Sequence, residues 1–397
     1  MKAKKFVFSI ILLTLLHSLI FLRITPKMYL TSLTLKNFRN YVDETFTFSE
    51  GINVLVGANA QGKTNVSEAV FYLCTGYSPK ASRERQLVNY NETKASIFGE
   101  AVSDFGKVNV GVNISADGDK EIFVNGAKIS KMADLYGNIN SVFFNPAELK
   151  LVQESPEDRR RFMNISLSQM SKRYFNALLR YNKILSQRNN LLKTYDRQLI
   201  LETLPVWDQS LSTEAAKIFS MRNDFISKLA PVCQDAHSYL SGGAEKLEMS
   251  SENSLSGTEE EIADLTYIQL KNSLEKDLKL GYTTFGPHRQ DIKFTLNGQD
   301  VRHYGSQGQQ RTVALSLKLG EVEIFKQTFG EYPILILDDV LSELDKKRQK
   351  LLIKKVEGVQ TILTATHVEK ATFSGVPFTK TTIENGKIKR PKNTKKA

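Results

Sequence analysis

The chain of 397 residues is long enough for two or three domains, or for one domain with a large insertion. Hydrophobic residues make up 41% and charged residues 24%, which is typical of soluble globular proteins and excludes collagen-like, wholly coiled-coil and disordered chains. The two cysteines, Cys74 and Cys233, lie far apart, so a disulfide framework and a CxxC zinc site are excluded. A reducing compartment is therefore favoured.

Two terminal segments carry the net charge of +11, which arises from 54 basic and 43 acidic residues. Residues 1–27 and 387–397 hold eleven basic residues and no acidic one, so the body of the chain, 28–386, is near neutral. A nucleic-acid-binding face must therefore come from a local arrangement of side chains. The basic tail is itself a candidate arm for nonspecific DNA binding.

An apolar extension covers residues 1–27. Residues 6–22 carry no charge, and as a helix they would span about 25 Å, slightly less than a hydrocarbon core of about 30 Å. Three interpretations are open: a cleaved secretory signal, a membrane anchor, or translated upstream sequence with the true start at Met28. The segment around Arg23 lacks a small-residue cleavage site, and we favour the start at Met28.

From Met28 onward the pattern predicts β structure. Asp117-Gly118 and Asn125-Gly126 are typical of hairpin turns, and a glycine-rich loop separates a buried strand from a helix over 64–74. Alternating or continuous apolar residues predict strands at 33–35, 46–48, 52–56, 108–114 and 142–144.

A helical block is predicted over 155–281. Ser155-Pro156 marks its start, with a capping residue followed by proline at the first helical position. Apolar residues then recur every three or four positions, Pro205 and Pro231 are expected to end helices, and 250–262 is expected to be a polar loop. A helix of about 35 residues would reach about 50 Å, so we expect a short arm and not a long coiled coil.

The β pattern returns after residue 281, with a hairpin at Asn297-Gly298, a helix over 309–325 and strands at 333–337 and 359–364. We therefore expect an α/β head formed by two separated pieces, with a helical arm, or lid, inserted between them. The expected division is an apolar extension at 1–27, the first part of the head at 28–154, the arm at 155–281, the second part of the head at 282–386 and a basic tail at 387–397.

A phosphate-binding motif, G-x-x-x-x-G-K-[ST], follows the apolar strand and precedes the first helix. Its residues are Gly57, Ala58, Asn59, Ala60, Gln61, Gly62, Lys63 and Thr64. The glycines let N–H groups converge on phosphate oxygens, and the helix N-terminus adds its free amides. We expect Lys63 to act on the β and γ phosphates of ATP, and the Thr64 hydroxyl to bind Mg²⁺.

Two acidic residues, Asp338 and Asp339, follow the apolar run 334–337. A strand buried on both faces would deliver these carboxylates at its C-terminal end. Asp338 is expected to hold Mg²⁺ through water, and Asp339 is expected to be the catalytic carboxylate that polarises the attacking water.

A polar segment opens the helix predicted at 309–325, and its free N–H groups suit an anion. Its residues are Ser306, Gln307, Gly308, Gln309 and Gln310. Ser342-Glu343-Leu344-Asp345, a strand and His367 follow the paired acids. Each of these features by itself is an ordinary helix cap or a surface histidine, and the prediction depends on their order.

That order resembles the ATP-binding cassette arrangement of SMC-type ATPases, and over 28–386 the chain more closely resembles the bacterial RecF family. The matching segments are Leu35-Lys36-Asn37-Phe38-Arg39-Asn40-Tyr41, Gly57–Asn65, Asn145-Pro146-Ala147-Glu148-Leu149, Pro156 to Arg161, Gly286-Pro287-His288-Arg289, Ser306–Arg311 and Leu337 to Asp345. Gln290 departs from the family, which has Asp there. Residues 76–94 diverge, with Lys80 and Arg83 recognisable, and residues 1–27 match nothing.

The resemblance implies an ABC/SMC-like P-loop ATPase head with an inserted short helical arm. It also implies a weak DNA-linked ATPase that uses ATP and Mg²⁺ and forms a homodimer on binding ATP, with residues 306–310 closing on the nucleotide of the other copy. The implied role is DNA repair and replication in the cytoplasm, on duplex DNA near single-stranded gaps, where RecR and RecO help to load RecA. Arg159, Arg160 and Arg161 are candidate DNA contacts, although a solvated helix face explains them equally well.

Two other functions compete with this one. A membrane-associated ABC-type ATPase subunit, recruited through residues 6–22, would have a much shorter insertion and a Leu-Ser-Gly-Gly-Gln signature, which this chain lacks. An SMC-like ATPase fused to a nuclease would need a further domain, but only 52 residues follow Asp345. Membrane association is thus not expected.

Overall fold

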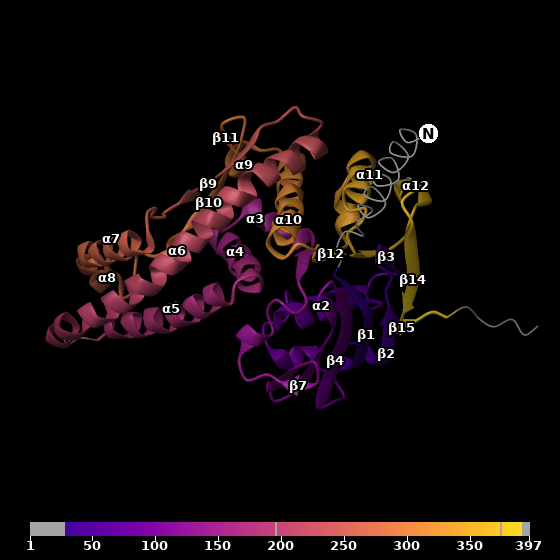
Figure 1. Ribbon diagram of the computed structural model, residues 1–397, viewed down its shortest axis with the longest axis horizontal. Coiled ribbons are helices and arrows are strands. Elements are labelled where there is room, and N and C mark those ends of the chain that lie inside the picture. The colour runs from indigo at the N-terminus through magenta and orange to yellow at the C-terminus, as the bar shows by residue number, and fades with distance from the viewer. Residues whose placement is uncertain (1–27, 195–196, 374, 391–397) are drawn as a thin grey trace, which may run out of the picture.

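The computed structural model describes residues 28–194, 197–373 and 375–390. The apolar extension 1–27 and residues 391–397 of the basic tail lie outside these described residues, and so do the predictions made for them. Two six-stranded sheets and their helices form a head, from which helices project as an arm (Figure 1). Within the described ranges, no helix is long and apolar enough to cross a membrane.

The first sheet of the head is antiparallel, in the order β2-β1-β4-β5-β6-β7. Its strands are β1 (Tyr29–Phe38), β2 (Tyr41–Thr47), β4 (Lys94–Ser103), β5 (Gly106–Ser115), β6 (Lys120–Val124) and β7 (Ala127–Lys128). Leu33 and Leu35 of β1 are fully buried, as the alternating pattern predicts for a sheet with one covered face. Asn125 and Gly126 both have positive φ, which the tight β6–β7 hairpin requires.

The central sheet has the order β15-β14-β3-β13-β12-β8, and all its pairings are parallel except that between β14 and β15. Its strands are β3 (Ile52–Val56), β8 (Ser141–Phe144), β12 (Ile334–Asp338), β13 (Thr361–Ala365), β14 (Phe378–Glu384) and β15 (Lys387–Ile388). Every residue of β3, β8, β12 and β13 is buried, because both faces of this sheet are covered. The parallel strands therefore end together at one edge, where ligand sites of such sheets form.

Two hydrophobic cores lie on opposite faces of the central sheet. Ile52, Val54 and Val56 of β3 belong to the core shared with the arm and with α10 (Gln307–Phe329), whereas Leu55 belongs to the core shared with α2 and the antiparallel sheet. Helix α2 (Lys63–Thr75) contacts strands of both sheets and so lies between them. The helix that leaves the phosphate loop is thus fixed on both sides by apolar packing.

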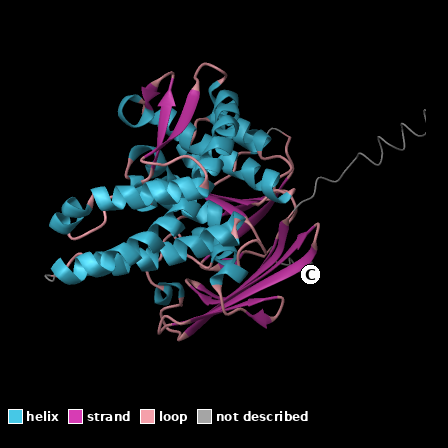
Figure 2. Ribbon diagram, turned by 60° about the vertical axis from the view of Figure 1, so that its left-hand side comes forward, coloured by secondary structure: helices cyan, strands magenta, loops and turns pink. Residues whose placement is uncertain are grey.

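The arm is formed mainly by α5 and α6, which run side by side, with α7 and α8 at its far end (Figure 1). A small sheet, β11-β10-β9, lies on the opposite side of these helices from the antiparallel sheet of the head (Figure 2). The remaining elements are α3 (Lys150–Gln153), α4 (Pro156–Met170), α5 (Lys172–Leu191), α6 (Arg197–Ser241), β9 (Leu247–Glu252), α7 (Glu259–Asn272), α8 (Leu274–Leu280), β10 (Asp291–Leu296), β11 (Gln299–Asp300), α9 (Val301–Tyr304), α10 (Gln307–Phe329), α11 (Lys346–Lys355) and α12 (Lys370–Phe373).

A buried ion-pair network ties the arm helices together. Arg188 of α5 is fully buried, and its Nε lies 2.6 Å from Oδ1 of Asp208 on α6. Its Nη1 lies 2.7 Å from Oδ2 of Asp277 on α8 and donates to Thr283 Oγ1 at 2.9 Å. One guanidinium therefore joins three helices of the arm, with a geometry that a shorter or more flexible cation would not reproduce.

The structure differs from the sequence prediction at the prolines of the arm. Pro205 and Pro231 do not end helices, because both lie inside the 45-residue helix α6. Proline removes one helical hydrogen bond, but α6 packs along its length on α5, α7, α10 and β9, and this packing holds the helix together. The loop predicted at 250–262 is shorter than expected, because residues 250–252 form the end of β9, which pairs with β10, and residues 259–262 form the start of α7.

Candidate nucleotide-binding site

The phosphate loop lies between the end of β3 and the start of α2, as predicted. Gly62, the residue before the helix, has φ 112°, a conformation that favours glycine, and a Cβ there would lie 2.8 Å from the Asn40 amide and the Tyr41 hydroxyl. A Cβ on Gly57 would overlap the carbonyl of Ile383. Both glycines of the motif are therefore required by close approach of neighbouring groups, and the free amides of α2 face the loop.

Polar side chains from outside the motif support the loop. Asn40 Nδ2 donates to the Gln61 carbonyl at 3.1 Å, and Tyr41 Oη donates to the Gly62 carbonyl at 3.0 Å. Asn65 Nδ2 on α2 donates to Asn40 Oδ1 at 2.8 Å. The sequence indicated Asn40 and Tyr41 only as part of the family resemblance. Both side chains donate to carbonyls of the phosphate loop, which explains why hydrogen-bonding residues occur at these two positions.

Lys63 lies across the phosphate loop. Its Nζ donates to the carbonyls of Gly57 and Ala58, each at 2.7 Å. Burial lowers the pKa of Lys63, and the carboxylates of Asp339 and Asp338 partly oppose that shift. The ammonium is thus held at the loop near two acidic residues that are far away in the sequence, as a lysine that contacts phosphates should be.

The proposed metal ligands meet although they are 274 positions apart. Asp338, at the end of β12, accepts hydrogen bonds at Oδ1 from Thr64 Oγ1 at 2.9 Å and from Thr364 Oγ1 at 2.8 Å. A hydroxyl and a carboxylate are ligands that suit Mg²⁺, so the residues fit the predicted cation. Thr364, which the sequence did not single out, orients Asp338 from the neighbouring strand β13.

Lys80 is a further charged residue of the site. Its Nζ lies 3.1 Å from Oδ2 of Asp338, the oxygen that the two threonines leave free. In the sequence, Lys80 is a recognisable residue of the divergent segment, but nothing there assigns it to the site. No local pattern could have found this pair, because its partners are 258 positions apart and meet only in the fold.

Asp339 stands at the rim of the site. It is exposed and has φ 58° and ψ 25°, and its backbone N–H donates to Thr364 Oγ1 at 2.9 Å. Asp339 and Thr364 line a cavity of about 250 Å³ together with residues 59–65. The left-handed backbone turns the chain sharply after Asp338, so the two neighbouring acids occupy different environments: one is buried among hydroxyls and the other is open to water.

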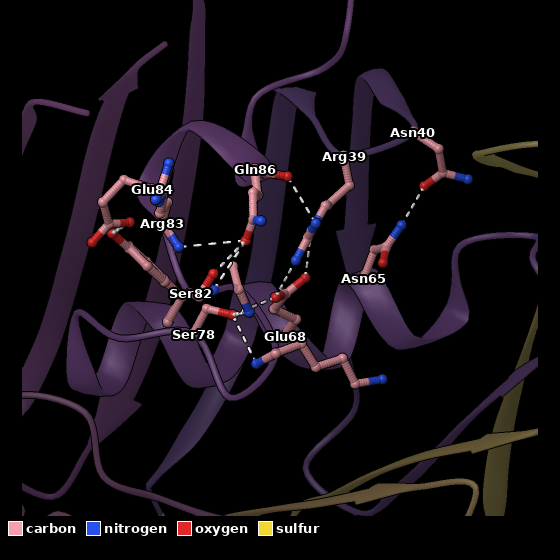
Figure 3. Close-up of polar contacts among 12 residues, drawn as sticks. Arg39, Asn40, Asn65, Glu68, Ser78, Ser82, Arg83, Glu84 and Gln86 are labelled. Atoms are coloured by element: carbon pink, nitrogen blue, oxygen red, sulfur yellow. Dashed lines mark hydrogen bonds and ion pairs between the residues drawn. The ribbon is translucent and has the colours of Figure 1, made fainter. Parts of the chain in front are cut away.

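A buried carboxylate fixes helix α2 to the turn between β1 and β2. Glu68, one turn beyond Lys63, accepts hydrogen bonds from Arg39 Nε at 2.8 Å and Arg39 Nη2 at 2.7 Å. Ser78 Oγ also donates to Glu68, and Arg39 Nη1 donates to the Gln86 carbonyl at 2.7 Å. Figure 3 shows Arg39 and Ser78 converging on Glu68 from two sides. This network joins the phosphate-loop helix to the segment that carries Lys80.

The segment 306–310 forms the start of α10. Ser306 is its N-cap, with Oγ accepting from Gln309 N at 3.3 Å, while Gln309 Oε1 accepts from Ser306 N at 2.8 Å. A Cβ on Gly308 would meet nothing within 4 Å in the described part of the chain, so the surface there is open. Gln310 is instead buried and donates to the Val301 carbonyl at 3.1 Å. None of residues 306–310 lines the cavity at the phosphate loop of the same chain.

The three arginines predicted to contact DNA have different environments. Arg159 is buried and forms a bidentate ion pair with Asp291, at 2.6 and 2.9 Å, so its assignment as a surface phosphate contact is wrong. Its position follows from the packing of α4 on β10, which the helical pattern alone does not reveal. Arg160 and Arg161 line a cavity of about 450 Å³ with Tyr77, and burial lowers the pKa of both.

The Gly286-Pro287-His288-Arg289 turn borders the same cavity. His288 Nδ1 lies 2.6 Å from Tyr181 Oη, and burial lowers the pKa of His288 to about 4. The buried Arg222 donates to the Pro287 carbonyl at 2.7 Å and to Gln290 Oε1 at 3.2 Å. Gln290 is the departure from the family pattern, and its amide serves here as a neutral acceptor for Arg222.

The fold and the site together define an ATP-binding head of the SMC type: a phosphate loop at the carboxyl edge of a buried parallel sheet, with a threonine and an aspartate set to hold a cation. The RecF/RecN/SMC N terminal domain matches residues 29–388. The chain belongs to the RecF family.

Several relatives support this assignment. The chain is 43% identical over 344 residues to the DNA replication and repair protein RecF of Lachnoclostridium phytofermentans, covering 86% of this chain and 94% of that protein. It is 39% identical over 342 residues to the same-named protein of Clostridium kluyveri, with the same coverage. Among solved structures, it is similar to the recombination mediator protein RecF-ATP in the RecFOR pathway, with a TM-score of 0.83 and 36% identity over 92% of this chain and 98% of that chain.

A more distant structure shows the fold alone. The SmcHead bound to the C-winged helix domain of ScpA superposes with a TM-score of 0.53 at 15% identity and covers 91% of this chain. The head with a helical insertion, predicted from the order of the motifs, is therefore confirmed.

Proposed function

We propose that this protein is an ATP-dependent DNA-binding protein of recombinational repair and replication, which dimerises when it binds ATP. The observation that carries the proposal is the meeting of Lys63, Thr64 and Asp338 at the phosphate loop. A solved relative is described as RecF-ATP, which supports ATP as the nucleotide. Residues 57–64 would bind its phosphates, and Mg²⁺ held by Thr64 and Asp338 would neutralise the charge that develops on them.

Dimerisation is inferred from the position of the segment 306–310. It is absent from the lining of the cavity at its own phosphate loop, and its surface at Gly308 is open. A capped helix start with free N–H groups suits a phosphate, and the nucleotide of a second copy is the one it can approach. The resulting dimer would hold two ATP molecules between two heads.

Hydrolysis would be slow and would release the dimer. Asp339 is exposed at the rim of the site, where its carboxylate can orient a water molecule and accept its proton. Asp338 is already engaged by two hydroxyls, so it cannot serve the same purpose. The two acids therefore divide cation binding and water activation between them.

DNA binding is proposed for the root of the arm, through Arg160 and Arg161, at duplex DNA near single-stranded gaps. The relative's place in the RecFOR pathway supports RecO and RecR as partners in loading RecA. The near-neutral body of the chain means that few phosphates are contacted, so binding should depend on the dimer, which doubles the number of phosphate-binding side chains.

The proposal is tested by light scattering of the purified protein with ATP, with ADP and without nucleotide, in the presence and absence of a gapped duplex. We expect monomers with ADP, dimers with ATP, and tighter DNA binding by the dimer. A monomer in ATP at all protein concentrations, or DNA binding that is independent of ATP, would contradict the proposal.

A further inference from the structure

A chain of polar contacts joins the long arm helix to the start of α10. His237 of α6 is fully buried, and its Nε2 lies 2.9 Å from Oε2 of Glu245, in the loop that follows α6. The other carboxylate oxygen of Glu245, Oε1, accepts a hydrogen bond of 2.8 Å from Gln309 Nε2. Gln309 in turn accepts from the Ser306 amide through Oε1. The arm thus reaches the capping residue of α10 through two side chains.

The carboxylate of Glu245 determines how the Gln309 amide is oriented. An ionised carboxylate only accepts hydrogen bonds, so Gln309 must turn its NH2 group toward Glu245 and its oxygen toward the Ser306 amide. The opposite orientation would place two oxygens together and an NH2 group against an N–H. Glu245 therefore selects the orientation in which Gln309 caps the helix.

His237 and Arg348 support Glu245 from two further elements. His237 Nδ1 faces Ser316 Oγ of α10 at 3.4 Å, so the imidazole lies between α10 and Glu245. Burial acts to raise the pKa of Glu245, but the hydrogen bonds from Gln309 and His237 outweigh it and lower the pKa, and the charge of Arg348 in α11 adds to this lowering. The Arg348 side chain also pairs with Asp345 at 2.6 Å. Asp345 is the N-cap of α11, so Arg348 links Glu245 to the start of a second helix besides α10.

We propose that Glu245 is a positioning residue, which sets Gln309 and the start of α10 for contact with the nucleotide of a second copy, and that His237 ties this setting to the arm. This inference rests on the proposed ATP-dependent dimer. Because α6 forms much of the arm, a ligand that moves the arm would also change the segment 306–310.

Two substitutions separate the effect of the length of the Glu245 side chain from the effect of its charge. Glu245→Asp keeps the charge but withdraws the carboxylate from Gln309, and it should weaken ATP-dependent dimerisation about 10- to 150-fold, the effect of removing one hydrogen bond to a charged group. Glu245→Gln keeps the length of the side chain, so its oxygen still accepts from Gln309. Its NH2 group donates to His237 Nε2, and His237 then carries its proton on Nδ1, which faces Ser316. This variant should dimerise like the unsubstituted protein.

Light scattering over a range of protein concentrations with ATP measures the dimer, and equilibrium binding of a fluorescent ATP analogue to dilute protein measures the monomer. Glu248→Asp is the matched control, because Glu248 is an exposed residue of β9 that pairs with Lys246. We expect monomer affinity for the analogue to be unchanged in all three variants.

Normal dimerisation of Glu245→Asp, or weakened dimerisation with Glu245→Gln alone, would overturn the positioning role. A failure of monomeric Glu245→Asp to bind nucleotide would assign a structural role instead and would also overturn it. If the unsubstituted protein fails to dimerise with ATP, the proposed function itself is wrong, and the positioning role is overturned with it.

Discussion

The ion pair between Arg39 and Glu68 should control how firmly the phosphate-loop helix is held. The Glu68 side chain is 1% exposed and that of Arg39 is 23% exposed, so Arg39→Ala leaves a buried carboxylate with Ser78 as its remaining side-chain donor. Breaking a buried pair costs about 3–5 kcal/mol, and access of water to this side of Glu68 reduces the expected cost to about 2–3 kcal/mol. Alanine keeps the Cβ of arginine, so the substitution does not change the backbone strain at φ 54°.

Hydrogen exchange of the α2 amides measures this free energy locally. A cost of about 2–3 kcal/mol corresponds to exchange that is about 30- to 150-fold faster in Arg39→Ala, and affinity for ATP should fall as the helix N-terminus loosens. Glu68→Gln in the same chain should restore most of the protection, because it removes the charge that is costly to leave buried. Arg85→Ala, an exposed arginine on the same segment as Gln86, is the control and should change neither quantity.

Two results would refute this reasoning. Unchanged α2 protection in Arg39→Ala would mean that apolar packing between the two sheets is sufficient to hold the helix. Failure of Glu68→Gln to restore protection would mean that Arg39 acts through its bond to the Gln86 carbonyl and not through the buried carboxylate.

Three further predictions concern nucleotide, dimer and DNA. Lys63→Ala should abolish tight ATP binding and dimerisation together, whereas Asp339→Asn should keep binding and accumulate an ATP-bound dimer; an equal fall in nucleotide affinity in both, measured by calorimetry, would contradict the separate roles. Ser306→Arg should leave ATP binding by dilute monomer intact but block the dimer in light scattering, and a monomer that no longer binds ATP would place this residue at the nucleotide of its own chain. Charge reversal of Arg160 and Arg161 to Glu should weaken DNA binding and reduce the slope of log affinity against log salt by about 0.9 for each DNA phosphate that the variant no longer neutralises; an unchanged slope would exclude these arginines.

The sequence by itself determined the local parts of the site. The phosphate loop, the strand before it and the helix after it are contiguous, so residue types that require a tight turn and buried neighbours were sufficient to locate them. The apolar run ending at Asp338 was recognisable for the same reason, since a strand buried on both faces has a simple pattern. The polar segment 306–310 was also recognisable as the start of a helix, and Ser306 caps that helix through Gln309, three positions away.

Only the tertiary structure decided which distant groups meet. Lys80 and Thr364 reach Asp338 because α2 and three parallel strands pack against one another, and no spacing in the sequence encodes that contact. Arg159 lies on a helix whose pattern allows it to face either way, and its pairing with Asp291 at the start of β10 turns it inward. Pro231 remains inside α6 because long-range packing outweighs the local preference of proline to end a helix. Local geometry is set by neighbouring residues, whereas burial and pairing are set by contacts that exist only once the chain has folded.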